Sequence, residues 1–381
     1  MLYLDHAATS PVRPEVLEAM QPYLTGAYGN PSSHHSVGEA AARALEWARG
    51  RVAAALGRRA SEVIFTSGGT EANNLAVKGV VLGSAHEPPA RRRLITTPIE
   101  HASILQSAEY LRRLHDVEVT LLPVDAHGVV AVDDLRAALD RGDTALVSVG
   151  HANNEIGTMQ DAAALISAAG EHDVPVHLDA VQTAGWVDLR DLGADCISIA
   201  GHKLGAPKGV GAVAVRARVP LEPLLHGGGQ ERGRRSGTEN VAGAVALAVA
   251  LDLAEAERAR STAAVAAQTT EFIAAVRSAV PQAALTGCAR HRLPNLASFT
   301  FAGTSGEAVL LELERRGVVS SSGSACAAGS DEPSPVLLAI GIPATVAQTS
   351  VRFTFPRAPL PAGSARRLAQ LVAAAVAAVS S

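Results

Sequence analysis

Residues 196–215 read Cys-Ile-Ser-Ile-Ala-Gly-His-Lys-Leu-Gly-Ala-Pro-Lys-Gly-Val-Gly-Ala-Val-Ala-Val. Two apolar runs, 196–200 and 210–215, predict buried strands on either side of a glycine-rich loop. Lys203 follows the first run, where an amine is poorly solvated, and such a lysine can form a Schiff base with an aldehyde. Because lysines are mostly exposed, a surface lysine is the commoner explanation of this residue alone. The rest of the chain decides between the two.

Strand and helix patterns alternate over the first two thirds of the chain. Strands are predicted at 63–66, 94–97, 117–121, 145–149, 174–178, 196–200 and 210–215. The alternation predicts an α/β fold in which a mainly parallel seven-stranded sheet is flanked by helices on both faces. Such sheets place their sites at the carboxyl ends of the strands. Residues that directly follow the strands are therefore the first candidates for a functional site.

A charged, alanine-rich helix at 255–275 connects this region to a second, smaller part of the chain. That part shows the patterns of two strands and two helices, at 296–301, 351–355, 306–315 and after Gly363. A further helix is predicted at 36–56, ending at Gly57. Residues 3–9 precede two prolines and are expected to be extended.

The composition excludes several classes of function. The 33 Lys+Arg and 37 Asp+Glu leave a formal net charge of -4, which gives no electrostatic footprint for nucleic acid or for an anionic membrane. The run Arg91–Arg93 is interpreted as part of a solvated loop. We expect no signal peptide, because residues 1–6 have neither a basic start nor an apolar core. The longest apolar runs, 241–251 and 371–379, are too short to span a bilayer. Both are interpreted as buried helices.

Three cysteines, Cys196, Cys288 and Cys326, are too few and too scattered for a disulfide framework or a zinc site. We therefore expect no metal and a reducing, cytoplasmic location. Cys196 lies inside a predicted strand and is interpreted as an inert buried residue.

The segment Thr66-Ser67-Gly68-Gly69-Thr70-Glu71-Ala72-Asn73 joins a predicted strand to a helix. Free backbone amides and a helix N-terminus favour an anion there, and Thr70 adds a hydroxyl. The segment is not a nucleotide P-loop, since the Gly-Lys-Ser/Thr ending is absent. A plain capped turn explains this segment equally well.

Other polar residues follow neighbouring strands. Asp179 ends an apolar strand, where an unpaired carboxylate would be costly, so we expect a partner such as a protonated ring nitrogen. An N-cap for the following turn is the alternative. His101 follows the strand at 94–97, and the polar stretch 151–157 follows the strand at 145–149. All lie at the same sheet edge as Lys203, and their convergence is stronger evidence than any one of them. An anion cradle, a carboxylate for a ring nitrogen and a lysine for an aldehyde together describe pyridoxal phosphate.

The chain resembles the cysteine desulfurases of the iron–sulfur-cluster and nitrogen-fixation type, which have the aspartate-aminotransferase-like fold (fold type I). The resemblance extends from Tyr3 to about Arg357. Its motifs are Tyr-Leu-Asp-His-Ala-Ala-Thr (3–9), Thr-Ser-Gly-Gly-Thr-Glu (66–71), Asn-Asn-Glu-Ile-Gly (153–157), Gly-His-Lys (201–203), His-Gly-Gly-Gly-Gln-Glu-Arg (226–232), Arg-Ser-Gly-Thr (235–238) and Ser-Ser-Gly-Ser-Ala-Cys (321–326).

The resemblance implies a role for each matching residue. Lys203 is expected to hold the cofactor and move protons, Asp179 to pair with the pyridine nitrogen, and Gln182 to bind the ring hydroxyl. His101 is expected on the ring face as a proton carrier. The resemblance further implies a phosphate site at Gly69, Thr70, Gly201 and His202, with Thr238 from a second subunit of a homodimer. It also implies that Asn154 and Arg352 bind the substrate carboxylate.

The chain departs from this pattern at Ala200. Many members of the family have a serine there that donates to the phosphate, so the cradle loses one hydroxyl while the neighbouring amide remains. We expect a somewhat altered affinity for the cofactor and no loss of activity.

Cys326 is the residue most specific to this chemistry. It lies among small residues, 320–330, which cannot form much core and predict a mobile loop. Cysteine reactivity depends on thiolate character and access, so we expect Cys326 to be the nucleophile.

The implied function is conversion of L-cysteine to L-alanine, with sulfur passed as a persulfide on Cys326 to an acceptor protein for iron–sulfur cluster assembly or another thiolation. The alternatives are a selenocysteine lyase or cysteine sulfinate desulfinase on the same cofactor, and a non-catalytic scaffold. We expect a large cofactor-binding domain at 15–257. Residues 1–14 and 258–381 are expected to form a smaller α+β domain that contains the cysteine loop.

Overall fold

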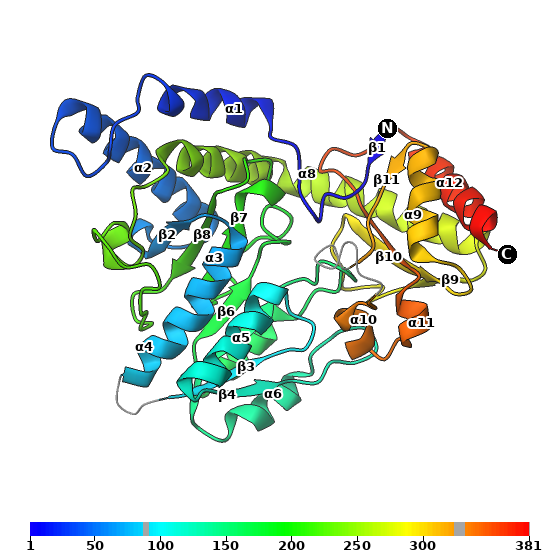
Figure 1. Cartoon of the computed structure of the whole chain (residues 1–381), viewed down its shortest axis with the longest axis horizontal. Helices are drawn as coiled ribbons and strands as arrows, with labels where there is room; N and C mark the ends of the chain where they lie inside the picture. Colours follow the sequence, from blue (N-terminus) through cyan, green and yellow to red (C-terminus); the bar gives the residue numbers. More distant parts are fainter. Residues whose placement is uncertain (87–90, 324–331, 381) are drawn as a thin grey trace.

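The structure is a computed structural model that describes residues 1–86, 91–323 and 332–380. Its centre is a seven-stranded sheet in the order β2-β8-β7-β6-β5-β3-β4 (Figure 1). The strands are β2 (Val63–Thr66), β3 (Arg93–Thr96), β4 (Glu118–Leu121), β5 (Thr144–Gly150), β6 (Val176–Asp179), β7 (Cys196–Ala200) and β8 (Gly211–Val215). β3 to β7 pair in parallel, whereas β8 is antiparallel to both of its neighbours. The mainly parallel sheet is confirmed, and so are its seven strands.

Helices cover both faces of this sheet because successive strand residues point to opposite sides. In β2, Val63 and Phe65 belong to one apolar core and Ile64 to another. The first core contains α1 (Pro14–Met20), α2 (Ser36–Ala55), α6 (Val132–Leu139), α7 (Ala162–Gly170) and the first part of α8 (Val241–Ala279). The second contains α3 (Gly69–Asn74), α4 (Val80–His86) and α5 (Ala102–His115). α3 continues into α4 through a π-helical turn, Leu75–Gly79.

The remaining elements pack around the C-terminal part of α8. β9 (Ala283–Leu285), β10 (Leu296–Phe301) and β12 (Ser350–Thr354) form an antiparallel sheet, with α9 (Gly306–Arg315) and α12 (Ser364–Val379) against it. Five of the six phenylalanines lie in this core, at 272, 299, 301, 353 and 355. Phe272 and Phe353 meet edge to face with ring centroids 5.1 Å apart. The phenylalanines are therefore concentrated in the core of the three-stranded sheet, where each large ring contributes much buried apolar area.

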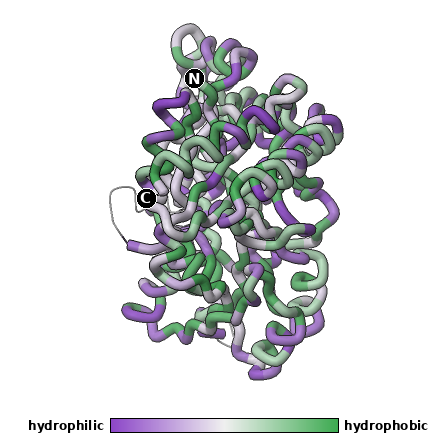
Figure 2. The backbone as a smooth tube through the Cα atoms, turned by 90° about the vertical axis from the view of Figure 1, so that its right-hand side faces the viewer, coloured by the Kyte–Doolittle hydropathy of each residue, from purple (hydrophilic) through white to green (hydrophobic). Residues whose placement is uncertain are grey.

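Short elements complete this part of the molecule. β1 (Leu2–Tyr3) pairs in parallel with β11 (Val318–Val319) and brings the N-terminal segment to the smaller sheet. α10 (Pro335–Ala339) and α11 (Ala344–Ala347) follow the second undescribed segment. Hydrophilic stretches lie mainly around the outline of the molecule (Figure 2). Within the three described ranges, no helix combines the length and the apolarity needed to cross a bilayer.

Three details differ from the sequence-based expectations. The apolar run 241–251 and the charged stretch 255–275 form one helix of 39 residues, α8, which runs from one core to the other (Figure 1). Its exposed middle needs charged residues, so the change in composition reflects a change in burial. Arg93 is only 1% exposed, because Asp143 and Thr144 accept hydrogen bonds from its guanidinium at 2.7 and 2.8 Å. Residues 5–8 form a turn, in which the Ala8 amide donates to the Asp5 carbonyl.

Candidate functional site

A cavity of about 580 Å³ opens at the carboxyl edge of the large sheet. Its walls come from the segments that follow β2, β3, β5, β6 and β7, from residues 7–9 and from Arg352. It brings together ten of the predicted site residues: Gly69, Thr70, His101, Asn154, Asp179, Gln182, Ala200, His202, Lys203 and Arg352. Gly201 and Thr238 do not line this cavity. Cys326 lies outside the described residues.

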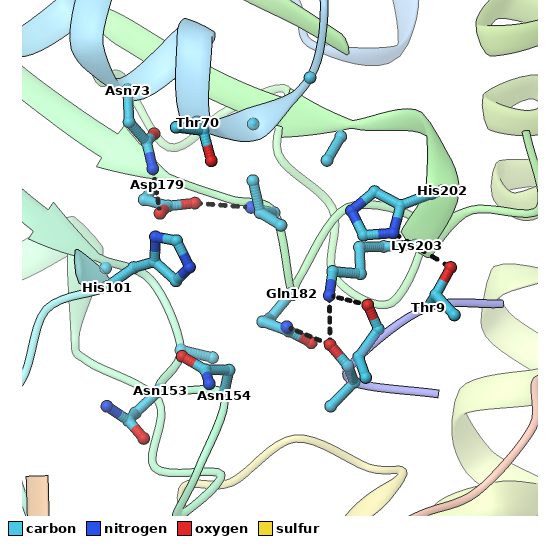
Figure 3. Close-up of a pocket in the computed structure, with 18 of the residues that line it drawn as sticks. Thr9, Thr70, Asn73, His101, Asn153, Asn154, Asp179, Gln182, His202 and Lys203 are labelled. Carbon is cyan, nitrogen blue, oxygen red and sulfur yellow. Dashed lines mark hydrogen bonds between the residues drawn. The ribbon is translucent and has the colours of Figure 1, made fainter. Parts of the chain in front are cut away.

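Lys203 reaches the cavity from a short 3-10 turn, Gly201–Lys203, that directly follows β7. Its Nζ donates to the carbonyl oxygens of Ala7 and Ala8, the latter at 2.7 Å (Figure 3). Gln182 donates to the same Ala7 oxygen at 3.1 Å. The N-terminal segment thus places the amine at the cavity, a contact across 195 residues of sequence.

His202, the preceding residue of this turn, meets the hydroxyl of Thr9 at 3.2 Å through Nδ1. Burial lowers its pKa to about 4, and the nearby charges of Lys203 and Lys208 act in the same direction. His202 is therefore neutral near pH 7 and acts as a hydrogen-bonding group. Gly201 is buried under it, where a Cβ would come within 2.9 Å of Val210.

Asp179 ends β6 with only 9% of its surface exposed. Its Oδ1 accepts from the Val181 amide at 2.9 Å, and its Oδ2 accepts from Nδ2 of Asn73 at 2.7 Å. The carboxylate thus caps a turn, as the alternative interpretation held, and also lines the cavity.

His101 is the N-cap of α5, and its Nδ1 accepts from the Ser103 amide at 3.1 Å. Burial lowers its pKa; Asp179 opposes that shift and Lys203 adds to it. The preceding residue, Glu100, also lines the cavity. Burial raises the pKa of Glu100 to about 8, and its Oε1 accepts from the Thr97 hydroxyl at 2.7 Å. A carboxyl group with a raised pKa therefore lines the same cavity as the imidazole.

The start of α3 forms one wall of the cavity. A Cβ on Gly69 would lie 2.9 Å from Val181 and 3.2 Å from the methyl group of Ala200, so only glycine fits there. No side chain caps α3 at Gly68, which leaves its first backbone amides available to an anion. Thr70 lies beside them (Figure 3).

Arg352 is 1% exposed and comes from β12 of the smaller sheet. Its Nη2 donates to Asp5 at 2.8 Å, and its Nη1 donates to the carbonyls of Asn154 and Gly323 at 2.8 and 3.2 Å. Its Nε is buried and has no partner in the described part of the chain. The side chain of Arg352 also lines the cavity.

Glu155 lies close to described residues on both sides of the segment 324–331, Gly323 and Ser334. The Ser334 hydroxyl donates to its Oε2, and a Cβ on Gly323 would lie 3.1 Å from the same oxygen. Burial raises the pKa of Glu155. Gly323 also accepts from Arg352, so the residue directly before this segment contacts a residue that lines the cavity.

Sequence reasoning assigned no role to Asn73, Asp5, Glu100 or Glu155, although three of them fall within the quoted motifs. Each is polar and at least partly buried. In the sequence, these residues could have been noticed as polar residues within otherwise apolar or small-residue segments. Asn73 also lies four residues after Gly69, on the same helix face.

A model of the family described as aminotransferase class-V matches residues 2–358 of the chain. Cysteine desulfurase IscS of Dictyoglomus turgidum is 45% identical over 355 residues, which cover 93% of this chain and 89% of that protein. The IscS-like cysteine desulfurase of Mycobacterium tuberculosis is 44% identical over 359 residues, with coverages of 93% and 91%. A solved structure of a NifS-like protein matches with a TM-score of 0.90 at 33% identity and covers 99% of this chain and 100% of its own.

Proposed function

The chain belongs to the aminotransferase class-V family as a pyridoxal-phosphate-dependent cysteine desulfurase, and we propose that Cys326 takes up the sulfur of L-cysteine as a persulfide, leaving L-alanine. The observation that supports this most directly is the convergence of Lys203, Asp179 and His101 on one cavity. When bound, pyridoxal phosphate withdraws electrons from the substrate and weakens its carbon–sulfur bond.

The residues of the cavity fit this cofactor. The wall at Gly69 is a cradle that a Cβ would fill, and it lies at a helix start that favours a phosphate. We propose that Gly69, Thr70 and His202 hold the phosphate, with the backbone at Ala200 and Gly201. Asp179 would pair with the ring nitrogen, Gln182 with the ring hydroxyl, and His101 would cover the ring face.

Lys203 and His101 would move protons, because both are basic side chains on the cavity wall and neither is assigned to the phosphate. The amine of Lys203 donates to two backbone carbonyls, those of Ala7 and Ala8, which keep it oriented toward the cavity. The imidazole of His101 is neutral near pH 7 because burial lowers its pKa, so it can accept a proton and return it.

Arg352 and Asn154 would bind the substrate carboxylate. A guanidinium presents a two-pronged fork to a carboxylate, and the buried Nε of Arg352 has no partner among residues 1–86, 91–323 and 332–380. Asn154 lines the same wall, and its carbonyl accepts from the Arg352 guanidinium.

Sulfur transfer is a displacement at sulfur. The Cys326 thiolate attacks the substrate sulfur, an S–S bond forms and the C–S bond breaks, with its electron pair kept by carbon, which then takes up a proton to complete alanine. The persulfide would pass to an acceptor protein that docks near Cys326. We propose a cytoplasmic location, since the transfer requires reduced thiols.

The test is alanine formed per enzyme from L-cysteine under a thiol reductant, for the wild type and Cys326→Ala side by side. We expect turnover by the wild type and none by the variant, which should still bind cofactor and cysteine. Normal alanine production by Cys326→Ala would contradict the assignment. If neither protein turns over despite bound cofactor, selenocysteine and cysteine sulfinate become the substrates to compare.

We further propose a homodimer in which a second copy of the chain supplies Thr238 to the phosphate. Thr238 is exposed and does not line the cavity of its own chain. Lys203→Ala and Thr238→Ala proteins, mixed and reassembled, should regain activity, since one of the two sites in a hybrid keeps both residues. Failure of hybrids to exceed either parent would exclude this arrangement.

We also propose that the chain divides into a large domain, 15–257, and a small domain formed by 1–14 and 258–381. The separate apolar cores at the two ends of α8 support it. In this division Arg352 comes from the small domain and Lys203 from the large one, so the cavity lies between them.

A further inference from the structure

Asn73 makes hydrogen bonds that have no role in the reaction proposed above. It lies one helical turn after Gly69 on α3 and is 1% exposed. Its Nδ2 donates to Oδ2 of Asp179 at 2.7 Å and to the hydroxyl of Ser103 at 3.0 Å. Figure 3 shows the amide directed at Asp179. One side chain thus joins the carboxylate on β6 to the start of α5, where His101 lies.

The direction of each hydrogen bond in this chain follows from the chemistry of the groups. The Asp179 carboxylate can only accept, so the amide nitrogen of Asn73 must face it. The Ser103 hydroxyl then accepts from Asn73, which leaves its proton for Nδ1 of His101 at 2.7 Å. The Ser103 amide also donates to Nδ1, at 3.1 Å. A neutral imidazole with two donors on Nδ1 has its proton on Nε2.

We propose that Asn73 and Ser103 are positioning residues of this enzyme. Their hydrogen bonds hold the Asp179 carboxylate and the His101 imidazole in one relative arrangement and keep the imidazole proton on Nε2, the nitrogen not held by Ser103. This inference rests on the proposed function, since there Asp179 and His101 contact the cofactor.

The buried carbonyl of Asn73 argues against a purely structural role. Its Oδ1 has no partner in the described part of the chain, and a buried acceptor without a partner destabilises the fold. An apolar side chain of similar size would avoid that loss. An apolar side chain could not donate the two hydrogen bonds. An amide in this orientation donates both from one nitrogen, to Asp179 and to Ser103.

The first test reads the tautomer directly, by ¹⁵N NMR of the full-length protein labelled at histidine, with His101→Gln to assign the signal. In the wild type we expect protonated Nε2 and unprotonated Nδ1. Ser103→Ala removes one donor to Nδ1, so the share of the Nδ1–H tautomer should rise roughly fivefold, the effect of one lost hydrogen bond. Ser107→Ala is the matched control: Ser107 is buried on the same helix and donates to the Ser103 carbonyl, and it should leave the tautomer unchanged. A wild-type Nδ1–H tautomer, or equal spectra for wild type and Ser103→Ala, would overturn the proposal.

The second test uses the holoenzyme and Asn73→Leu, with Asn74→Leu as control. Asn74 donates to the carbonyl of Thr70 one turn earlier, and not to Asp179. For Asn73→Leu we expect kcat to fall about tenfold with KM within about twofold, and the cofactor absorbance spectrum to change, because the Asp179 carboxylate loses the donor that holds it in place. An unchanged absorbance profile and kcat in Asn73→Leu would overturn the proposal, and if that variant does not fold, Ser103→Ala decides alone. A wild type that shows the Nε2–H tautomer but does not turn over cysteine would contradict the proposed function and not this inference.

Discussion

Arg49 and Arg352 are both almost completely buried, but their hydrogen bonds differ. Every nitrogen of Arg49 has a protein partner: Nε donates to Glu46, Nη1 to Glu231 and the Val63 carbonyl, and Nη2 to Glu231. Arg352 has one carboxylate partner, Asp5, and its Nε has none among the described residues. Arg49 thus links the segment at Glu231 to the edge strand β2. Arg352 lines the cavity.

The same difference separates two histidines. Both ring nitrogens of His177 meet serine hydroxyls, those of Ser148 and Ser198, each at 2.9 Å. The contacts of His101 are on Nδ1, and its ring faces the cavity (Figure 3). Burial alone therefore does not separate structural from functional polar residues. The useful criterion is whether the protein satisfies every donor and acceptor or leaves one for a ligand.

The largest expected effect comes from breaking the fully satisfied pair. Arg49→Met leaves the Glu231 carboxylate buried without its opposite charge, so the free energy of unfolding should fall by about 3–5 kcal/mol. Denaturant unfolding measures it, and alanine production per folded enzyme should stay within about twofold of the wild type. The double variant Arg49→Met/Glu231→Met should recover most of the loss, because replacing a whole buried pair by apolar residues is often neutral. A single variant as stable as the wild type would remove the basis of the comparison.

His177 should make stability depend on pH. Burial lowers its pKa from 6.5 to about 4, so between these values the unfolded chain binds a proton that the folded one does not. Its contribution is complete above pH 6.5 and is lost as the pH falls toward 4, about 3 kcal/mol in total at 1.36 kcal/mol per pKa unit. The wild type should therefore lose more stability than His177→Gln between pH 7 and 4. Parallel pH profiles for the two proteins would contradict this.

Arg352→Lys should affect activity more than stability. Lysine keeps the charge but cannot present a fork to a carboxylate, so kcat/KM for cysteine should fall about 100-fold, at the low end of the effect of truncating a buried charged hydrogen bond. Arg366→Lys is the control, because Arg366 is 78% exposed and pairs only with Glu271. A kcat/KM within about threefold of the wild type would mean that Arg352 is structural in the same sense as Arg49.

The smallest effect is expected for Asp5→Asn. Asp5 and the substrate carboxylate share the guanidinium of Arg352, so neutralising Asp5 should strengthen substrate binding and lower KM about threefold, a modest change typical of a partly exposed charge pair. Steady-state kinetics with cysteine measure it. A KM that rises instead would show that Asp5 holds the Arg352 guanidinium in place for its ligand.

Much of the site was predictable because parallel strands end at a common edge. Asp179, Lys203 and His101 each follow a strand, so the alternating pattern already placed them together. Which residues support them was not predictable. The motif at 66–73 indicated an anion site, but the rotation of α3 decides that Asn73 faces Asp179 while Asn74 turns back to Thr70. Arg93 shows the same limit, since its buried partner Asp143 is 50 residues away in the sequence.

The sequence alone determined the fold class, the order of the large sheet's strands along the chain and the chemistry available at their ends, because hydrophobic periodicity and strand-end residues are local properties. Only the tertiary structure decided which polar groups the protein satisfies itself and which it leaves for a ligand. The pair of Arg352 and Asp5 spans 347 residues, and no local pattern encodes such a contact. Hydrogen bonding depends on distances of a few ångströms between segments, and packing sets those distances.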